Sequence, residues 1–272
     1  MVLVRRGVVE VDVDRVGAGP PVVLLGSVAG GRQVWDPLAD SLLDRYRVLT
    51  LQMHGHGATP PWSGARPQTL TDAVRLVHAV TAGGTERLAL VGHSFGGAVA
   101  MRAAVELGER VRALVLIEPM PFALLARAGR GDLLDDVRAS RDRLRADLTA
   151  GRRDEGARAL TDHWLGTGVW DRLPAEHRAA IHAALGHRLA EFDALTDPGL
   201  TLAEVATAES PTLLIHSPTP VEPVRALVDL LVGARPDWER AAVPGAGQGA
   251  PLTGAAAFGP LVGEFLDRHL GR

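Results

Sequence analysis

The chain has 272 residues, and 46% of them are hydrophobic, which is enough for a domain with a large core. Its formal net charge of −3 argues against a nucleic-acid or anionic-membrane partner. There is no cysteine, so disulfides, thiolate metal sites and a cysteine nucleophile are excluded, and all 29 basic residues are arginine, so a lysine Schiff base is excluded as well.

The first residues, MVLVRRGVVEVDVD, lack the apolar segment of a signal peptide. No apolar run approaches the ~20 residues of a membrane span. We therefore expect a cytoplasmic protein that has no membrane partner. We also expect that it uses no cofactor. The sequence leaves the oligomeric state open.

In the first 120 residues, short strand patterns alternate with helical ones. Apolar alternation and β-branched runs predict strands at residues 8–13, 22–25, 48–53, 88–91 and 111–117. Apolar residues at helical spacing predict helices at 36–45, 70–82 and 98–107. Strands that alternate with helices are typical of a mostly parallel sheet flanked by helices on both faces.

The alternation stops after residue 117. From about 122 to 208 the chain shows helical patterns, broken by Gly and Pro, and no convincing strand. Strand patterns return at 212–216 and 238–243, and helical ones at 224–232 and 257–270. We therefore predict an α/β core in two parts, 1–119 and 209–272, with a helical insertion over 120–208.

The most informative motif is GHSFGG, residues 92–97, which lies between a strand pattern and a helix pattern. It is G-x-S-x-G in the strand-then-helix context that a nucleophile elbow requires. Small residues permit a sharp turn, so Ser94 is expected in a strained bend with its hydroxyl exposed. The backbone N–H of Phe95 would then face the site from a helix N-terminus. A tight glycine-rich turn without a catalytic role is the alternative.

Five segments in order resemble the α/β-hydrolase family and together cover almost the whole chain. Besides the elbow, residues 24–28 with Trp35 resemble the oxyanion-loop segment, and residues 52–59 resemble D-x-R-G-H-G-x-S. Residues 211–216 resemble the strand before the catalytic acid, and 243–248 resemble P-G-x-G-H. The resemblance implies an α/β-hydrolase fold whose helical insertion is a lid.

Each of these segments except the elbow departs from the family's pattern. Gly26-Ser27 replaces the His-Gly of the oxyanion loop, and Gln52 and His54 replace the Asp and Arg of the next motif. The acid position holds Pro220, and the histidine position holds Gln248. A serine hydrolase needs a base and an acid that orients it. Glutamine has no pKa near 7 and cannot be that base.

Other residues are candidates to replace the lost groups. Glu222 lies two positions after Pro220, and Glu118 ends a predicted strand where some family members carry their acid. For Glu118 the alternative is a salt bridge with a lid arginine. The insertion also holds histidines that are able to reach the pocket, at His163, His177, His182 and His187. Because none has a triad partner at a recognisable spacing, we favour a lost triad over a rebuilt one.

A pocket between the sheet and the lid is still expected. Its predicted substrate-binding residues are Trp35, Met53, Met120, Phe122, Trp164, Trp170 and Gln248. For the lid aromatics, burial inside the lid is the alternative. The backbone N–H groups of Val28 and Phe95 are predicted to form an oxyanion hole, which stabilises any carbonyl that gains negative charge, including an enolate.

Three functions follow as hypotheses. The first is a non-hydrolytic isomerase, epimerase or cyclase that moves a proton next to a carbonyl of an apolar or peptide natural-product substrate, with Ser94 and Glu118 as catalytic residues. Its pattern of losses resembles peptide epimerases of the bottromycin type. The second is a serine hydrolase, an esterase, thioesterase or peptidase, that uses Ser94 with a displaced base. The third is a protein that binds a small-molecule or peptide ligand without turnover.

Overall fold

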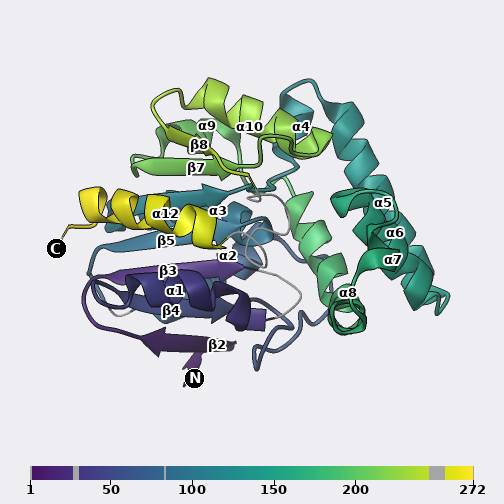
Figure 1. The fold of residues 1–272 in the computed structure, drawn as a ribbon, viewed down its shortest axis with the longest axis horizontal. Helices are drawn as coiled ribbons and strands as arrows, with labels where there is room; N and C mark the ends of the chain where they lie inside the picture. Colours follow the sequence, from purple (N-terminus) through teal and green to yellow (C-terminus); the bar gives the residue numbers. More distant parts are fainter. Residues whose placement is uncertain (1, 27–30, 83, 245–254, 272) are drawn as a thin grey trace.

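The computed structural model describes residues 2–26, 31–82, 84–244 and 255–271. Eight strands form one sheet in the order β1-β2-β4-β3-β5-β6-β7-β8 (Figure 1). β2 is antiparallel to β1 and β4, and all other neighbours are parallel. The strands are β1 (Val2–Arg6), β2 (Val9–Val16), β3 (Pro21–Gly26), β4 (Arg47–Gln52), β5 (Leu88–His93), β6 (Val111–Ile117), β7 (Thr212–His216) and β8 (Glu239–Ala242).

Both faces of the parallel strands other than the edge strand β8 are buried. In β3, for example, Val23 and Leu25 belong to one apolar cluster and Val22 and Leu24 to another, because successive side chains of a strand point to opposite faces. This two-sided burial explains the continuous apolar runs in the sequence.

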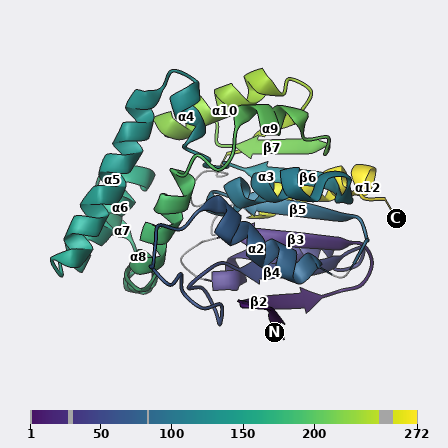
Figure 2. The ribbon, with the colours of Figure 1, turned by 180° about the vertical axis from the view of Figure 1, so that it is seen from behind.

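The helices of the core divide between the two faces (Figures 1 and 2). Side chains of α1 (Asp36–Leu42) and α12 (Ala255–His269) pack on one face. Those of α2 (Leu70–Thr81), α3 (Phe95–Leu107) and α10 (Glu222–Ala234) pack on the other. Short 3₁₀ turns, η1 (Gly31–Trp35) and η2 (Gly108–Arg110), precede α1 and β6. The predicted α/β-hydrolase architecture is therefore confirmed.

Between β6 and β7 the chain forms helices only. These are α4 (Leu124–Arg127), α5 (Gly131–Thr149), α6 (Arg153–Leu165), α7 (Val169–Arg172), α8 (Ala175–Leu195) and α9 (Leu202–Thr207). Helices α5 to α8 project from one end of the sheet (Figure 1). A small apolar cluster of their own, which includes Leu144, Trp170 and Leu185, holds them together.

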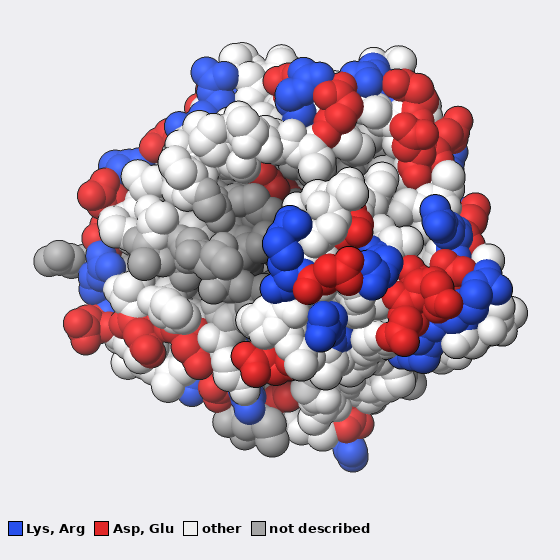
Figure 3. Space-filling view, turned by 45° about the vertical axis from the view of Figure 1, so that its right-hand side comes forward, with Lys and Arg blue, Asp and Glu red and all other residues white. Residues whose placement is uncertain are grey.

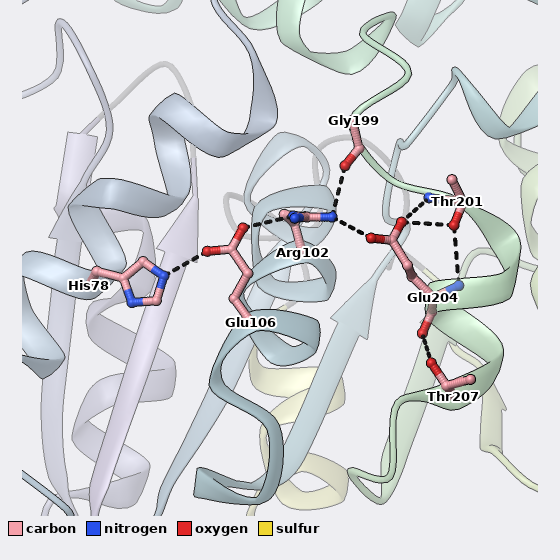
Figure 4. A network of polar contacts seen from close by, with 7 residues as sticks. All are labelled: His78, Arg102, Glu106, Gly199, Thr201, Glu204 and Thr207. Carbon is pink, nitrogen blue, oxygen red and sulfur yellow. Dashed lines mark hydrogen bonds and ion pairs between the residues drawn. The ribbon is translucent and has the colours of Figure 1, made fainter.

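A chain of charged groups ties the last of these helices, α9, to the core (Figure 4). Arg102 of α3 donates to Glu106 at 2.8 Å, to Glu204 at 2.8 Å and to the carbonyl oxygen of Gly199 at 2.9 Å. Glu204 also caps the start of α9 through Thr201. One guanidinium thus fixes the position at which the inserted helices return to the sheet.

The structure differs from the sequence-based elements mainly at their ends. β1 was not predicted, because its side chains are mostly exposed and carry little apolar pattern. Helix α3 begins at Phe95, three residues before the predicted start. Within the described ranges, no helix is both long and apolar enough to cross a membrane. On the face shown in Figure 3, arginines and acidic residues intermingle and neither sign dominates.

Candidate active site

Ser94 lies between the last residue of β5 and the first residue of α3. Its φ is 55° and its ψ is −118°, a region that residues other than glycine rarely adopt. Its amide donates to the carbonyl oxygen of Ile117 at 3.0 Å, and its own carbonyl accepts from the amide of Gly97 at 3.0 Å. These bonds hold a conformation that costs on the order of 1–3 kcal/mol. The strained elbow expected from the sequence is present, but the prediction of an exposed hydroxyl is wrong, because Ser94 is buried against Met120.

Two glycines make this elbow sterically possible. A Cβ on Gly92 would lie 2.4 Å from the carbonyl oxygen of Gly96, and a Cβ on Gly96 would lie 2.1 Å from that of Leu25. The start of α3 therefore rests directly on the end of β3. Phe95 occupies the first position of α3, where the helix leaves amides without a partner of its own. Val28, the second predicted oxyanion donor, lies outside the described residues.

The hydroxyl of Ser94 contacts a sulfur atom. Ser94 Oγ donates to Met120 Sδ at 3.2 Å, and the amide of Met120 donates back to the Ser94 carbonyl at 3.3 Å. Both residues are buried, with 9% of Ser94 and 4% of Met120 exposed. A thioether is a weak acceptor that takes up no proton at neutral pH. Met120, a predicted substrate-binding residue, thus touches the candidate nucleophile without being able to activate it.

No histidine serves as the base in this arrangement. All ten histidines lie among the described residues, and none of them accepts the Ser94 hydrogen bond. On the lid, His182 pairs with Asp154 at 2.6 Å, and His163 rests edge-on against Trp164 with ring centroids 4.9 Å apart. Burial lowers the pKa of His163. The position of the family histidine, Gln248, lies outside the described residues.

Glu118, the predicted catalytic carboxylate, supports the neighbouring loop. It has a left-handed φ of 41°, is 1% exposed, and its Oε1 accepts from the amide of Ser217 at 3.0 Å. Its own amide donates to the carbonyl oxygen of Ile215 at 2.9 Å. Glu118 thus ties the end of β6 to the loop after β7, where the family carries its acid and this chain has Pro220. A part for Glu118 in catalysis stays a prediction.

Glu222 does not replace the missing acid in this structure. It begins α10 at the surface and pairs with Arg225 and, at 3.3 Å, with Arg130. The hydrogen bonds from Arg225 and Arg130 hold the pKa of its carboxyl below the usual value. The side chain is 44% exposed and engaged by two surface guanidiniums, so we do not assign it a catalytic role.

Most of the other predicted lining residues belong to one apolar cluster. Met53, Phe95, Met120 and Phe122 belong to the same buried cluster. The ring of Trp164 on α6 stacks on Phe122 with centroids 5.5 Å apart. This cluster joins the elbow to the inserted helices through Phe122 and Trp164.

Two predicted lining residues lie elsewhere. Trp170 is 5% exposed and belongs to the core of the inserted helices, the alternative stated for it above. Trp35 packs in the cluster on the α1 face of the sheet, and its indole touches the end of β3 at Gly26. Neither belongs to the apolar cluster that contains Phe95, Met120 and Phe122.

One buried polar contact between core and lid has no signal in the sequence. His56 Nε2, in the loop after β4, lies 3.2 Å from Glu191 Oε1 on α8, and Arg188 Nη1 lies 2.9 Å from Glu191 Oε2. The side chains of His56 and Glu191 are 8% and 5% exposed. His56 and Glu191 are 135 positions apart in the sequence, so no local sequence pattern predicts their contact. Within the described part of the chain, no cluster of three or more His, Asp or Glu is arranged to hold a metal ion.

The strand order, the elbow after β5 and the inserted helices after β6 are the defining features of an α/β-hydrolase. The family model for the alpha/beta hydrolase fold matches residues 20–187, so the chain belongs to this family. A hydrolase structure from Pseudomonas aeruginosa superposes with a TM-score of 0.78 and 25% identity, covering 97% of each chain.

Several curated relatives are named for hydrolysis, although one that covers 97% of this chain at 29% identity is a polyketide synthase of Burkholderia thailandensis. A pimeloyl-[acyl-carrier protein] methyl ester esterase of Aeromonas hydrophila is 32% identical over 199 residues, covering 68% of this chain and 73% of the esterase. A 2-(acetamidomethylene)succinate hydrolase of Mesorhizobium japonicum is 28% identical over 143 residues, about half of each chain. Against other curated relatives, the matched region spans about two fifths of their length. The protein is thus similar to enzymes named as esterases and hydrolases.

Proposed function

We propose that the protein is a hydrolase of a small carboxylic ester or amide, with Ser94 as the nucleophile. The observation that carries this proposal is the elbow, where a serine is held at φ 55° by the packing of Gly92 and Gly96. Strained backbone of this kind clusters at functional sites. The names of the relatives support the same class of substrate.

In the proposed reaction, Ser94 Oγ forms a bond to the carbonyl carbon of the substrate. The carbonyl oxygen becomes an oxyanion, which the amides of Phe95 and Val28 would stabilise. The carbon–oxygen or carbon–nitrogen bond to the leaving group then breaks, and the leaving group takes a proton. Water hydrolyses the acyl-serine and restores the Ser94 hydroxyl.

The removal of the proton from the Ser94 hydroxyl is the unusual step of this reaction. Gln248 and Met120 accept no proton near pH 7. We therefore infer that hydroxide or a basic group on the substrate itself accepts the proton of Ser94. A succinate, the compound in the name of one relative, carries carboxylates of its own that could take this part.

The pH dependence tests this step. A histidine base gives kcat/KM an inflection near its pKa of ~6.5–7. We expect none here, and instead a steady rise from pH 6 to 9 on a p-nitrophenyl ester, at a rate far below that of a complete triad. Ser94→Ala should remove this activity, and a fluorophosphonate probe should label wild type but not Ser94→Ala. An inflection near pH 7 would contradict the assignment of the proton.

A second function, proton transfer next to a carbonyl, is favoured by the missing base and acid. With Gln248 and Pro220 at those positions, an oxyanion hole without an activated nucleophile would suit an isomerase or epimerase of an apolar or peptide substrate. In D₂O such an enzyme incorporates one deuterium beside the carbonyl, and Ser94→Ala loses at most about tenfold in rate. A hydrolase instead loses all turnover with Ser94→Ala and shows no such exchange. Ligand binding without turnover or exchange would contradict both proposals.

A further inference from the structure

A recess of about 300 Å³ lies at the opposite end of the sheet from Ser94. The first residues of three parallel strands, Pro21 of β3, Arg47 of β4 and Leu88 of β5, line it. Ser94 follows the other end of β5. The full length of the strands therefore separates this recess from the elbow, and a ligand there would not compete with the substrate.

Four arginines converge on this recess: Arg6 of β1, Arg15 of β2, Arg47 of β4 and Arg110 of η2. The strand register explains part of this convergence. Arg15 pairs with Leu49, and Leu49 lies two residues from Arg47, so all three belong to the same face of the sheet. Apolar side chains line the recess between the arginines, and Val4 and Val80 form a partly exposed apolar floor above the buried Val23, Leu49 and Leu88.

The positive charges of the recess are only partly balanced. Glu86 is the one carboxylate among the residues that line it, and Arg47 donates to it at 2.6 Å. Arg6 and Arg110 donate instead to neutral carbonyl oxygens at the end of α2, those of Ala82 at 2.7 Å and Thr81 at 3.0 Å. The lining therefore carries a clear excess of positive charge.

One guanidinium also holds a donor without an acceptor. Within the described residues, Arg110 Nε is buried and has no hydrogen-bond partner, although the same guanidinium donates to Thr81 through Nη2. Buried donors of this kind are rare and destabilise a fold unless something accepts their hydrogen bond. The hydrogen bonds of the Arg110 guanidinium are therefore not fully satisfied within the protein.

We propose that this recess binds a small organic phosphate, with its phosphate groups on Arg15, Arg47 and Arg110 and its apolar body on Val4 and Val80. The planar guanidinium fork matches two phosphate oxygens at once, and several arginines around one site suit a diphosphate. The apolar floor favours an ester over the bare anion. The site is independent of the function proposed for Ser94.

Isothermal titration calorimetry with adenosine 5′-diphosphate as the probe tests the proposal. We expect a Kd of ~0.1 mM at low salt, with weaker binding of inorganic pyrophosphate and weakening by 0.3 M NaCl. The double variant Arg15→Gln/Arg47→Gln should lose at least about tenfold in affinity. Glu86→Gln should instead gain several-fold, because it removes the one opposing charge. Arg240→Gln, on the distant strand β8, is the matched control and should bind as wild type.

Three results would overturn the proposal. The first is no binding of adenosine 5′-diphosphate at millimolar concentration. The second is binding that the Arg15→Gln/Arg47→Gln variant and the Arg240→Gln control share equally, since that would place the ligand elsewhere. The third is binding of succinate as tight as that of the diphosphate, which would show that any dianion suffices. Circular dichroism of each variant confirms that it is folded.

Discussion

The contact between α3 and β3 predicts that Gly96→Ala is severely destabilising. The new Cβ would lie 2.1 Å from the carbonyl oxygen of Leu25, whereas real Cβ atoms essentially never approach closer than 3.0 Å. The two backbones must separate by roughly 1 Å in a close-packed interior. Overpacking costs about 1–3 kcal/mol when side chains are able to yield, and here the obstacle is backbone, so we expect about 3 kcal/mol or more.

The assay is urea denaturation followed by circular dichroism, with Gly186→Ala as the matched control. Gly186 lies in α8, is exposed, and a Cβ there meets no atom within 4 Å. The same substitution should stabilise the helix there by about 0.5–1 kcal/mol, because alanine restricts the unfolded chain. If the same Gly→Ala substitution lowers the free energy of unfolding at position 96 and raises it at position 186, the loss at 96 comes from the steric contact with Leu25. A Gly96→Ala protein within 1 kcal/mol of wild type would refute the described elbow.

Three further predictions concern stability. Ser94→Gly should raise the free energy of unfolding by about 1 kcal/mol while Ser94→Ala does not, because glycine relieves the left-handed backbone; equal thermal midpoints would contradict this. Arg102→Gln should cost about 1–3 kcal/mol in urea denaturation, since it leaves Glu106 and Glu204 without their shared partner (Figure 4); Arg240→Gln is the control. Burial opposes ionisation of Asp72, but hydrogen bonds from Arg66 and Thr69 lower its pKa from 3.8 to about 2. The stability contributed by ionised Asp72 is therefore present above pH 3.8 and lost as the pH falls toward 2, a loss that Asp72→Asn should not show.

The fold could be predicted because its signals are local. Each parallel strand except the edge strand β8 is buried on both faces and reads as an apolar run, and the elbow carries its own motif between a strand and a helix. β1 could not be predicted because it is an exposed edge strand, whose side chains carry little apolar pattern. The start of α3 was placed too late because the glycines of the elbow hide a helix that begins at once after Ser94.

The surroundings of the site could not be predicted, because they depend on contacts between distant segments. No sequence pattern near Met120 indicates that its sulfur accepts a hydrogen bond from Ser94. The orientation of a helix decides whether an aromatic faces the site, so Trp164 meets Phe122 while Trp170 stays within the lid. The His56–Glu191 pair and the arginine recess likewise join residues from several elements.

The strained elbow favours a nucleophilic Ser94, whereas the missing base leaves that serine without activation. The size of the rate loss limits which substrates such a serine is able to attack. A serine hydrolase that loses its triad keeps a rate about 10³–10⁴ above that in water, from its oxyanion hole and substrate binding. Such a residual rate suffices for a substrate with a good leaving group or with its own base. It does not suffice for an unactivated amide, whose cleavage needs proton transfer to the leaving nitrogen. If Ser94 is a nucleophile, its substrate must therefore be an activated acyl compound or must carry the base that Gln248 cannot provide.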